Sequence, residues 1–337
     1  MGNWTQVSHF TLGAYSDLGP LRWLYFVLTL SSYMLIVGSN LLLIALIVLN
    51  RSLHQPMYLL LCSLFVNELY GSSTLFPFLL FQILQDQHTV PYALCYLQIF
   101  CLYLYACVEI FTLAAMSYDR YVAICRPLQY HSVMTHRQVA LLLTGTWLAP
   151  SVAIGVLLWL SMSLPLCGNI IDKIYCGNYS IVKLSCKSVQ LNNIYGLFYT
   201  VLSMICPLFL ILYTYGRILV LCLSAPGQAR HKALSTCMPH LASLLNFSFG
   251  CCSQIVMSRF DMSGMPDALA VFLSLYFFTC QPLFNPVIYG LKLSQIREQL
   301  RRLWFGNNTE TTQQQHNPRT VSEWNQIEVI KDSRLTR

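Results

Sequence analysis

Residues 109–125 read EIFTLAAMSYDRYVAIC, and this stretch decides the fold. It belongs to an apolar run of membrane length, with one acid, Glu109, near the middle of that run and the pair Asp119–Arg120 close to its end. Charges inside a membrane segment cost free energy, and those that persist there generally serve a function. The stretch therefore predicts a membrane-spanning helix with functional charges at its middle and at one end.

The whole chain has the composition of a polytopic membrane protein. Of its 337 residues, 55% are hydrophobic and only 10% are charged, whereas about a quarter of the residues in a soluble domain are charged. A helix needs about 20 apolar residues to cross the hydrocarbon layer, and spanning helices satisfy their own backbone groups in lipid. We therefore predict an all-α membrane protein with a bundle at 24–291, whose seven spans cover approximately 24–49, 56–84, 91–125, 139–160, 193–223, 231–257 and 268–291.

Three segments flank this bundle. Residues 1–23 are expected to form an extracellular N-terminus without a cleavable signal peptide, because the start is polar and lacks an apolar region. Residues 292–305 alternate apolar and basic side chains at helical spacing, which indicates an amphipathic helix on the inner leaflet with membrane lipid as its partner. Residues 306–337 are polar and are expected to be a disordered cytoplasmic tail.

Basic residues set the orientation of the chain. They follow the odd-numbered spans, for example at Arg51 and Arg126, so the positive-inside rule places the N-terminus outside the plasma membrane and the C-terminus in the cytoplasm. Two sequons on the outer side, at Asn3 and Asn178, predict glycosylation. The net charge of +7 is dispersed and forms no basic stripe, so no nucleic-acid partner is expected.

Four of the fourteen cysteines lie in or beside external segments: Cys95, Cys167, Cys176 and Cys186. The oxidising side of the membrane favours disulfides. Four cysteines allow three connectivities, and their spacing alone does not choose among them.

Several motifs resemble the signatures of olfactory receptors, within the rhodopsin-like G-protein-coupled receptors. They are PMYLLL at 56–61, MSYDRYVAIC at 116–125, KALSTCMPHL at 232–241 and PVIYGLK at 286–292. LPLCG, SIVKLSC and NNIYG resemble most closely the fish-type, class I-like branch. The resemblance implies disulfides Cys95–Cys176 and Cys167–Cys186, which would hold the long external loop over the bundle as a lid.

The same motifs contain the residues expected to couple the receptor to a G protein. Arg120 has a fixed charge that needs a partner, and Asp119 can hold it at rest. Pro286 interrupts its helix, and we expect Asn285 to satisfy the backbone groups that this frees, which would make a hinge. The full set of expected coupling residues is Asp119, Arg120, Tyr121, His240, Asn285, Pro286 and Tyr289.

Two acids, Glu68 and Glu109, lie near the middle of their spans. Two such groups must share a proton or bind a cation. We expect them to line a polar cavity with Asn40 and Asn285, and the sequence leaves open whether that cavity holds a sodium ion or a shared proton.

The resemblance also implies a ligand pocket in the outer halves of spans three, five, six and seven, below the external loop. Arg259, at the outer end of span six, can bind a carboxylate through two hydrogen bonds, or it can extend to the membrane interface or pair with Asp261. Ser248 stands where many family members have tyrosine. The pocket candidates are Tyr103, Ala106, Cys107, Tyr179, Tyr199, Ser203, Ser248, Cys251, Ile255, Arg259 and Phe278.

These observations favour an odorant receptor that binds a small molecule and activates a stimulatory olfactory-type G protein that raises cAMP. If Arg259 binds a carboxylate, the odorant is an acid. One alternative is a receptor of the same fold for an endogenous hormone or lipid, acting outside olfactory tissue. Another is an ion transporter or channel that uses Glu68 and Glu109. No catalytic constellation is present in the sequence, so an enzyme is not expected, and no cofactor is expected apart from the sodium ion.

Overall fold

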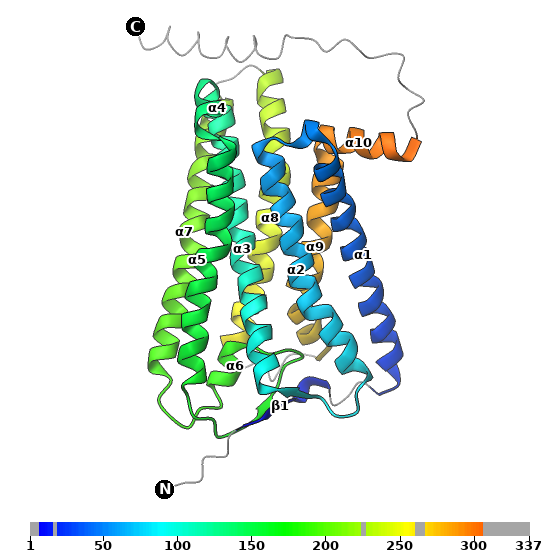
Figure 1. Ribbon diagram of the computed structural model, residues 1–337, viewed down its shortest axis with the longest axis vertical. Coiled ribbons are helices and arrows are strands. Elements are labelled where there is room, and N and C mark those ends of the chain that lie inside the picture. Colours follow the sequence, from blue (N-terminus) through cyan, green and yellow to red (C-terminus); the bar gives the residue numbers. More distant parts are fainter. Residues whose placement is uncertain (1–6, 16–18, 224–226, 260–266, 306–337) are drawn as a thin grey trace.

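The computed structural model describes residues 7–15, 19–223, 227–259 and 267–305. Within these ranges seven helices are long and apolar enough to cross a membrane, and they form one elongated bundle (Figure 1). The seven are α1 (Arg22–Leu49), α2 (Pro56–Leu84), α3 (Tyr92–Cys125), α5 (His136–Met162), α7 (Gln190–Leu223), α8 (Gly227–Arg259) and α9 (Asp267–Lys292). The tail at 306–337 and the sequon at Asn3 lie outside the described residues.

Shorter helical segments connect or flank the seven. The α-helical ones are α4 (Tyr130–Val133), α6 (Asn178–Val182) and α10 (Ser294–Phe305), and the 3₁₀ turns are Gly13–Tyr15, Gly19–Leu21, Arg51–Leu53 and Pro127–Gln129. Helix α10 runs across the end of the bundle instead of along it (Figure 1). Its residue Ile296 is fully buried against the bundle and Arg297 is exposed, as an amphipathic surface helix requires.

Local chemistry sets where the spanning helices begin. Pro56 opens α2, at a position where its missing N–H costs nothing. Thr135 caps α5 by accepting a hydrogen bond from the backbone N–H of Gln138 at 3.3 Å. Helices α5 and α7 therefore extend a turn beyond the apolar runs at 139–160 and 193–223, because polar first-turn residues continue a helix without adding to the lipid-facing stretch.

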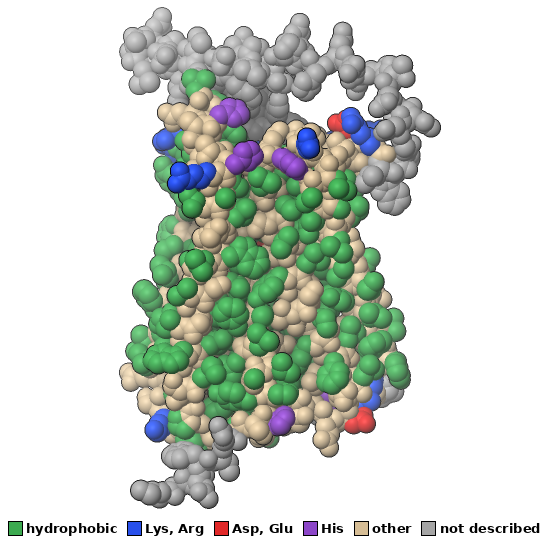
Figure 2. All heavy atoms as spheres, in the orientation of Figure 1, with side chains coloured by type: hydrophobic (Ala, Val, Ile, Leu, Met, Phe, Trp, Pro, Cys, Tyr) green, Lys and Arg blue, Asp and Glu red, His purple; other side chains and the backbone are tan. Residues whose placement is uncertain are grey.

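Helix α3 is the centre of the bundle, with most of its side chains buried between the other helices. The outward faces of α1, α5 and α7 expose large apolar side chains, such as Leu35, Trp159 and Phe209. Figure 2 shows these hydrophobic side chains over the middle of the molecule and the charged ones near its two ends. That distribution matches a bilayer around the middle of the bundle.

The prolines of α9 leave a backbone carbonyl without its helical hydrogen bond, and the side chain that satisfies it is not the predicted one. Pro286 has no N–H, so the carbonyl of Pro282, four residues earlier, loses its helical partner. Asn40 of α1 fills the gap: its Nδ2 donates to the Pro282 carbonyl at 3.0 Å and to the Ile36 carbonyl at 2.9 Å. The Asn285 side chain makes other contacts, so the expectation that it satisfies the freed backbone groups was wrong. The expectation that Asn40 lines a polar cavity with the two acids was also wrong.

A three-stranded sheet closes the outer end of the bundle, where the sequence analysis had assigned no structure. Strand β1 (His9–Leu12) lies between β2 (Thr89–Pro91), to which it is antiparallel, and β3 (Ile170–Ile171), to which it is parallel. Phe10 and Leu12 of β1 are buried. The chain just before α1 is therefore part of the packed structure (Figure 1).

Replacing Asn40 by alanine should leave the Pro282 carbonyl buried and unpaired. We expect the free energy of unfolding to fall by about 1–3 kcal/mol, measured as a lower Tm of the receptor purified in detergent. Ser39→Ala is the matched control, because Ser39 bonds only to the Ile36 carbonyl of its own helix. Equal Tm values for the two variants would contradict the assignment.

Candidate ligand cavity and coupling residues

A cavity of about 530 Å³ lies in the outer half of the bundle. It is enclosed by α3, α7, α8 and α9 and covered by the external loop that contains α6. Ten of the eleven pocket candidates line it together: Tyr103, Ala106, Cys107, Tyr179, Tyr199, Ser203, Cys251, Ile255, Arg259 and Phe278.

The eleventh candidate, Ser248, does not line the cavity. The floor closes about one helical turn above it, where the thiol of Cys251 contacts the sulfur of Met204 at 3.7 Å. Below that level Phe247 packs edge-on against Phe277 with ring centroids 5.5 Å apart.

The sequence analysis missed several polar side chains of the lining, chiefly from the external loop and from α7. They include Lys173, Tyr175, Asn192 and Gln254. Helical spacing within single spans could not reveal the loop residues, because the disulfides and the loop path decide which of them face inward. The loop carries disulfides Cys95–Cys176 and Cys167–Cys186, the two pairs that the resemblance implies.

Asn178 also lines the cavity, and this placement argues against its glycosylation. Its side chain is 6% exposed. The Oδ1 atom accepts a hydrogen bond from Ser161 at 2.5 Å, and Nδ2 donates to Asn192 at 3.4 Å. A glycan needs an accessible amide nitrogen at the surface, and this nitrogen is enclosed by its partners.

Positive charge gathers at the outer end of the cavity. The guanidinium of Arg259 lies 4.2 Å from the ring centroid of Tyr179, and the Nζ of Lys183 lies 4.9 Å from the same ring. Lys173 donates to the Met257 carbonyl at 3.0 Å, and burial, followed by the charge of Lys183, lowers its pKa. Among the side chains that the structure describes, no carboxylate forms an ion pair with these three cations, although the charge of Asp172 acts on its neighbour Lys173. The side chains of Asp261 and Asp267 are not described.

Below the cavity a buried polar network contains both mid-span acids. Asn285 Nδ2 donates to Glu68 Oε1 at 2.5 Å and to Glu109 Oε1 at 2.9 Å. Gln281 Nε2 donates to Glu109 Oε1 at 2.9 Å, and Asn67 Nδ2 donates to Glu109 Oε2 at 3.0 Å. Helices α2, α3 and α9 are joined at this point.

The hydrogen bond to the fourth carboxyl oxygen, Glu68 Oε2, requires a glycine in the neighbouring helix. Tyr105 of α3 donates its hydroxyl to Glu68 Oε2 at 2.9 Å. Its ring passes directly over Gly71 of α2, where an added Cβ would lie 2.4 Å from a ring carbon. Any larger residue at 71 would displace the ring, so this close approach explains the glycine.

The charged pair at the inner end of α3 forms the expected contact and has one unexpected partner. Arg120 donates through Nε to Asp119 Oδ2 at 2.9 Å and also through a second nitrogen. Tyr130 of α4 donates its hydroxyl to Asp119 Oδ1 at 2.8 Å. Burial and the charge of Asp119 raise the pKa of Tyr130, so this hydroxyl stays protonated and remains a donor. Tyr121 packs against Tyr213 of α7, with ring centroids 6.3 Å apart.

The remaining coupling candidates connect α8 with α9. His240 Nδ1 and the Tyr289 hydroxyl lie 3.2 Å apart, and both side chains are buried. One turn further out Ser243 donates to Asn285 Oδ1 at 2.6 Å. Asn285 therefore links the inner half of α8 to the two acids, next to Pro286 in α9.

These features are those of a seven-helix receptor: a cavity beneath the external loop, a polar network below it, and a restrained charge at the inner end. Squid rhodopsin shares the fold, with a TM-score of 0.66 at 18% identity, over 89% of this chain and 91% of that one.

The sequence comparisons give the family. The olfactory receptor family model matches residues 29–306. Olfactory receptor 11A1 of Homo sapiens is 34% identical over 312 residues, covering 92% of this chain and 98% of that protein. Olfactory receptor 4E2 of Mus musculus is 35% identical over 303 residues, covering 89% of this chain and 96% of that protein. The chain belongs to the olfactory receptor family; it is a multi-pass odorant receptor of the plasma membrane and not an enzyme.

Replacing Tyr130 by phenylalanine removes one of the two groups that hold Asp119. A hydrogen bond to a charged group contributes about 1.5–3 kcal/mol, so we expect ligand-independent cAMP production to rise by about tenfold at equal surface expression. Ser132→Ala is the control, since Ser132 bonds only within its own loop. Unchanged basal cAMP in the Tyr130 variant would show that Asp119 restrains Arg120 without help.

Proposed function

We propose that this odorant receptor binds small molecules with an acidic group, which meets Arg259 at the outer end of the cavity. The observation that carries the proposal is the cationic cluster there, whose members form no ion pair with a carboxylate among the side chains that the structure describes. An arginine can hold a carboxylate through two parallel hydrogen bonds. The Tyr179 ring supports the guanidinium from one side and leaves its edge available.

The rest of the cavity suits the body of such a ligand. Leu102, Phe277 and Phe278 supply apolar surface. Tyr103 and Gln254 supply the few polar groups that orient a ligand in a mostly apolar site. A volume of about 530 Å³ is within the range of small-molecule pockets.

We propose further that ligand binding shifts α8 relative to α3 and frees Arg120 for a stimulatory olfactory-type G protein. A ligand shifts such an equilibrium only by its different affinity for the two states. Contacts with Gln254 and Arg259 at the outer part of α8 supply that difference, and the bonds of Ser243 and His240 to α9 connect it to the inner half. Helix α10 then lies on the inner leaflet as a lipid-facing anchor. The fish-type, class I-like assignment stays a prediction from the loop motifs.

The test is a cAMP-reporter screen of straight-chain carboxylates and their methyl esters. Arg259→Gln keeps a polar side chain but removes the charge, so responses to the acids should fall by at least about tenfold while responses to neutral esters remain. Lys187→Gln is the control, because Lys187 is an exposed cation of the external loop between α6 and α7 that does not line the cavity. Equal responses of Arg259→Gln and the parent receptor to acids would end the proposal.

For the acid pair we propose a shared proton in preference to sodium. All four carboxyl oxygens already accept hydrogen bonds from amide or hydroxyl donors, and one nitrogen, Asn285 Nδ2, bonds to both groups. Two ionised carboxylates this close in a buried site would repel each other, and a proton shared between them removes that cost. A sodium ion would need several of these oxygens to face it instead. The described residues hold no group of three His, Cys, Asp or Glu side chains suited to a metal.

A shared proton makes the response to ligand independent of sodium. Replacing sodium by choline in the medium should leave agonist potency unchanged. Glu109→Gln, which mimics the protonated acid, should keep surface expression, whereas Glu109→Leu should lose it because the donors of Asn67 and Gln281 would be buried without acceptors. A sodium-dependent shift in potency that disappears in Glu109→Gln would instead establish an ion site.

A further inference from the structure

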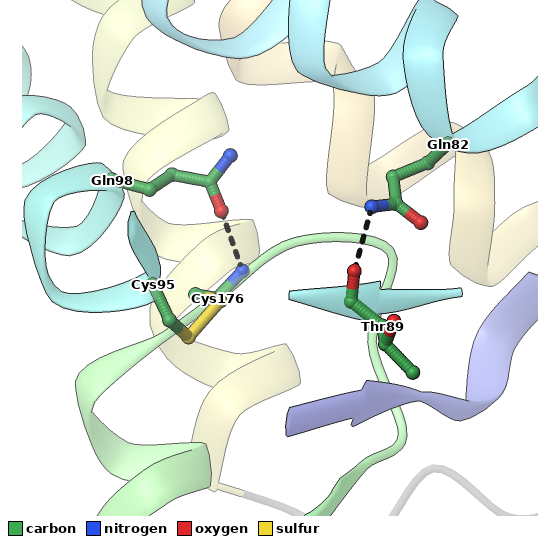
Figure 3. The surroundings of a disulfide bond; sticks show 5 residues. All are labelled: Gln82, Thr89, Cys95, Gln98 and Cys176. Atoms are coloured by element: carbon green, nitrogen blue, oxygen red, sulfur yellow. Dashed lines mark hydrogen bonds between the residues drawn. A yellow bond between two sulfur atoms is a disulfide. The ribbon is translucent and has the colours of Figure 1, made fainter. Parts of the chain in front are cut away.

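The loop segment from Lys173 to Cys176 crosses the outer end of the cavity, and three of its four residues line it: Lys173, Tyr175 and Cys176. One end is fixed to α3. Cys176 is joined to Cys95, and its backbone N–H donates to Gln98 Oε1 at 2.9 Å (Figure 3). Ile174, between the two lining side chains, faces away from the cavity and is 7% exposed.

The N-terminal segment holds the same loop from the outside. Thr11 of β1 donates its backbone N–H to the Asn169 carbonyl at 2.7 Å, and β1 then pairs with β3. Tyr15, just after β1, donates its hydroxyl to the carbonyl of Ile174 at 2.8 Å. The Tyr15 ring is 4% exposed and stacks on His88 with a centroid distance of 4.8 Å. Burial raises the pKa of Tyr15, so the hydroxyl remains a donor.

Helices α8 and α9 hold the loop from the inside. The Tyr175 hydroxyl donates to Gln254 Oε1 at 2.6 Å. Gln254 in turn donates through Nε2 to the carbonyls of Leu273 and Ser274 in α9, each at 2.9 Å. The Tyr175 ring also meets Phe278 edge-on at 5.5 Å.

We propose that Tyr15 is a positioning residue of the ligand site, acting through the Ile174 carbonyl on Lys173 and Tyr175, with Gln254 as the opposing anchor. Tyr15 does not line the cavity. Its bond fixes the peptide group that joins Ile174 to Tyr175, and a small rotation of that group would move both neighbouring side chains. The inference rests on the proposed ligand site and adds that the N-terminal segment sets its affinity.

The direct test is Tyr15→Phe, which keeps the ring on His88 and removes only the hydroxyl. One buried hydrogen bond contributes about 1 kcal/mol, so we expect the potency of the best straight-chain carboxylate to fall by about five- to tenfold at equal surface expression. Tyr25→Phe is the matched control, because Tyr25 lies exposed on α1. An unchanged potency of Tyr15→Phe would overturn the proposal.

A crosslink distinguishes positioning from general stability. When the parallel register of β1 and β3 is continued by one residue, Gly13 lies opposite Asp172. A Cβ on Gly13 would lie 3.7 Å from the Asp172 Cα, a spacing that suits a disulfide. Gly13→Cys with Asp172→Cys, added to Tyr15→Phe, should restore the potency lost. The same positions changed to serine should not. Failure of the disulfide-bonded variant to restore potency would overturn the proposal.

Hydrogen exchange separates this inference from the proposed function. In the purified full-length receptor, Tyr15→Phe should accelerate exchange of the backbone amides at 170–176, and Tyr25→Phe should not. If the parent receptor ignores every carboxylate, the acidic-ligand proposal fails, and the exchange result alone decides the role of Tyr15. Unchanged exchange at 170–176 would overturn it.

Discussion

Two carboxyl groups in the middle of a membrane protein are the constraint on which the structure depends. Glu68 and Glu109 are both fully buried, and an unpaired charge at this depth would cost several kcal/mol. Donors from three helices meet them: Tyr105 and Asn67 on α3 and α2, and Gln281 and Asn285 on α9. Because α8 joins the network through Ser243, any displacement of that helix changes how well the acids are paired.

The ligand cavity and the inner charge pair lie on either side of this network. Above it, Gln254 connects the loop, α8 and α9. Below it, His240 and Tyr289 join the same two helices. Outer and inner contacts therefore involve the same pair, α8 and α9. Under the proposed mechanism, a ligand that alters one set would act on the other by moving these two helices.

Much of this arrangement follows from the sequence, because lipid imposes simple rules. Apolar runs predicted the seven helices, and ten of the eleven pocket candidates, chosen from helical spacing together with the family resemblance, line one cavity. The failures involve contacts between segments far apart in the chain. Asn40 meets Pro282 across 242 positions, and Tyr130 reaches Asp119 from the next loop. No periodicity encodes such pairs, and Ser248 was misplaced because neighbouring rings, not its own helix, decide where the cavity ends.

The sheet formed by β1 shows how an external cover can be fixed without strict sequence requirements. Its pairing with β2 and β3 is made by main-chain atoms, which every residue except proline provides in full. Only the inward-facing positions, occupied by Phe10 and Leu12, ask for apolar side chains. The outward positions of this strand could therefore change without altering how it holds the loop, whereas a change at Tyr15, whose side chain bonds to the Ile174 carbonyl, would remove one of the loop's attachments.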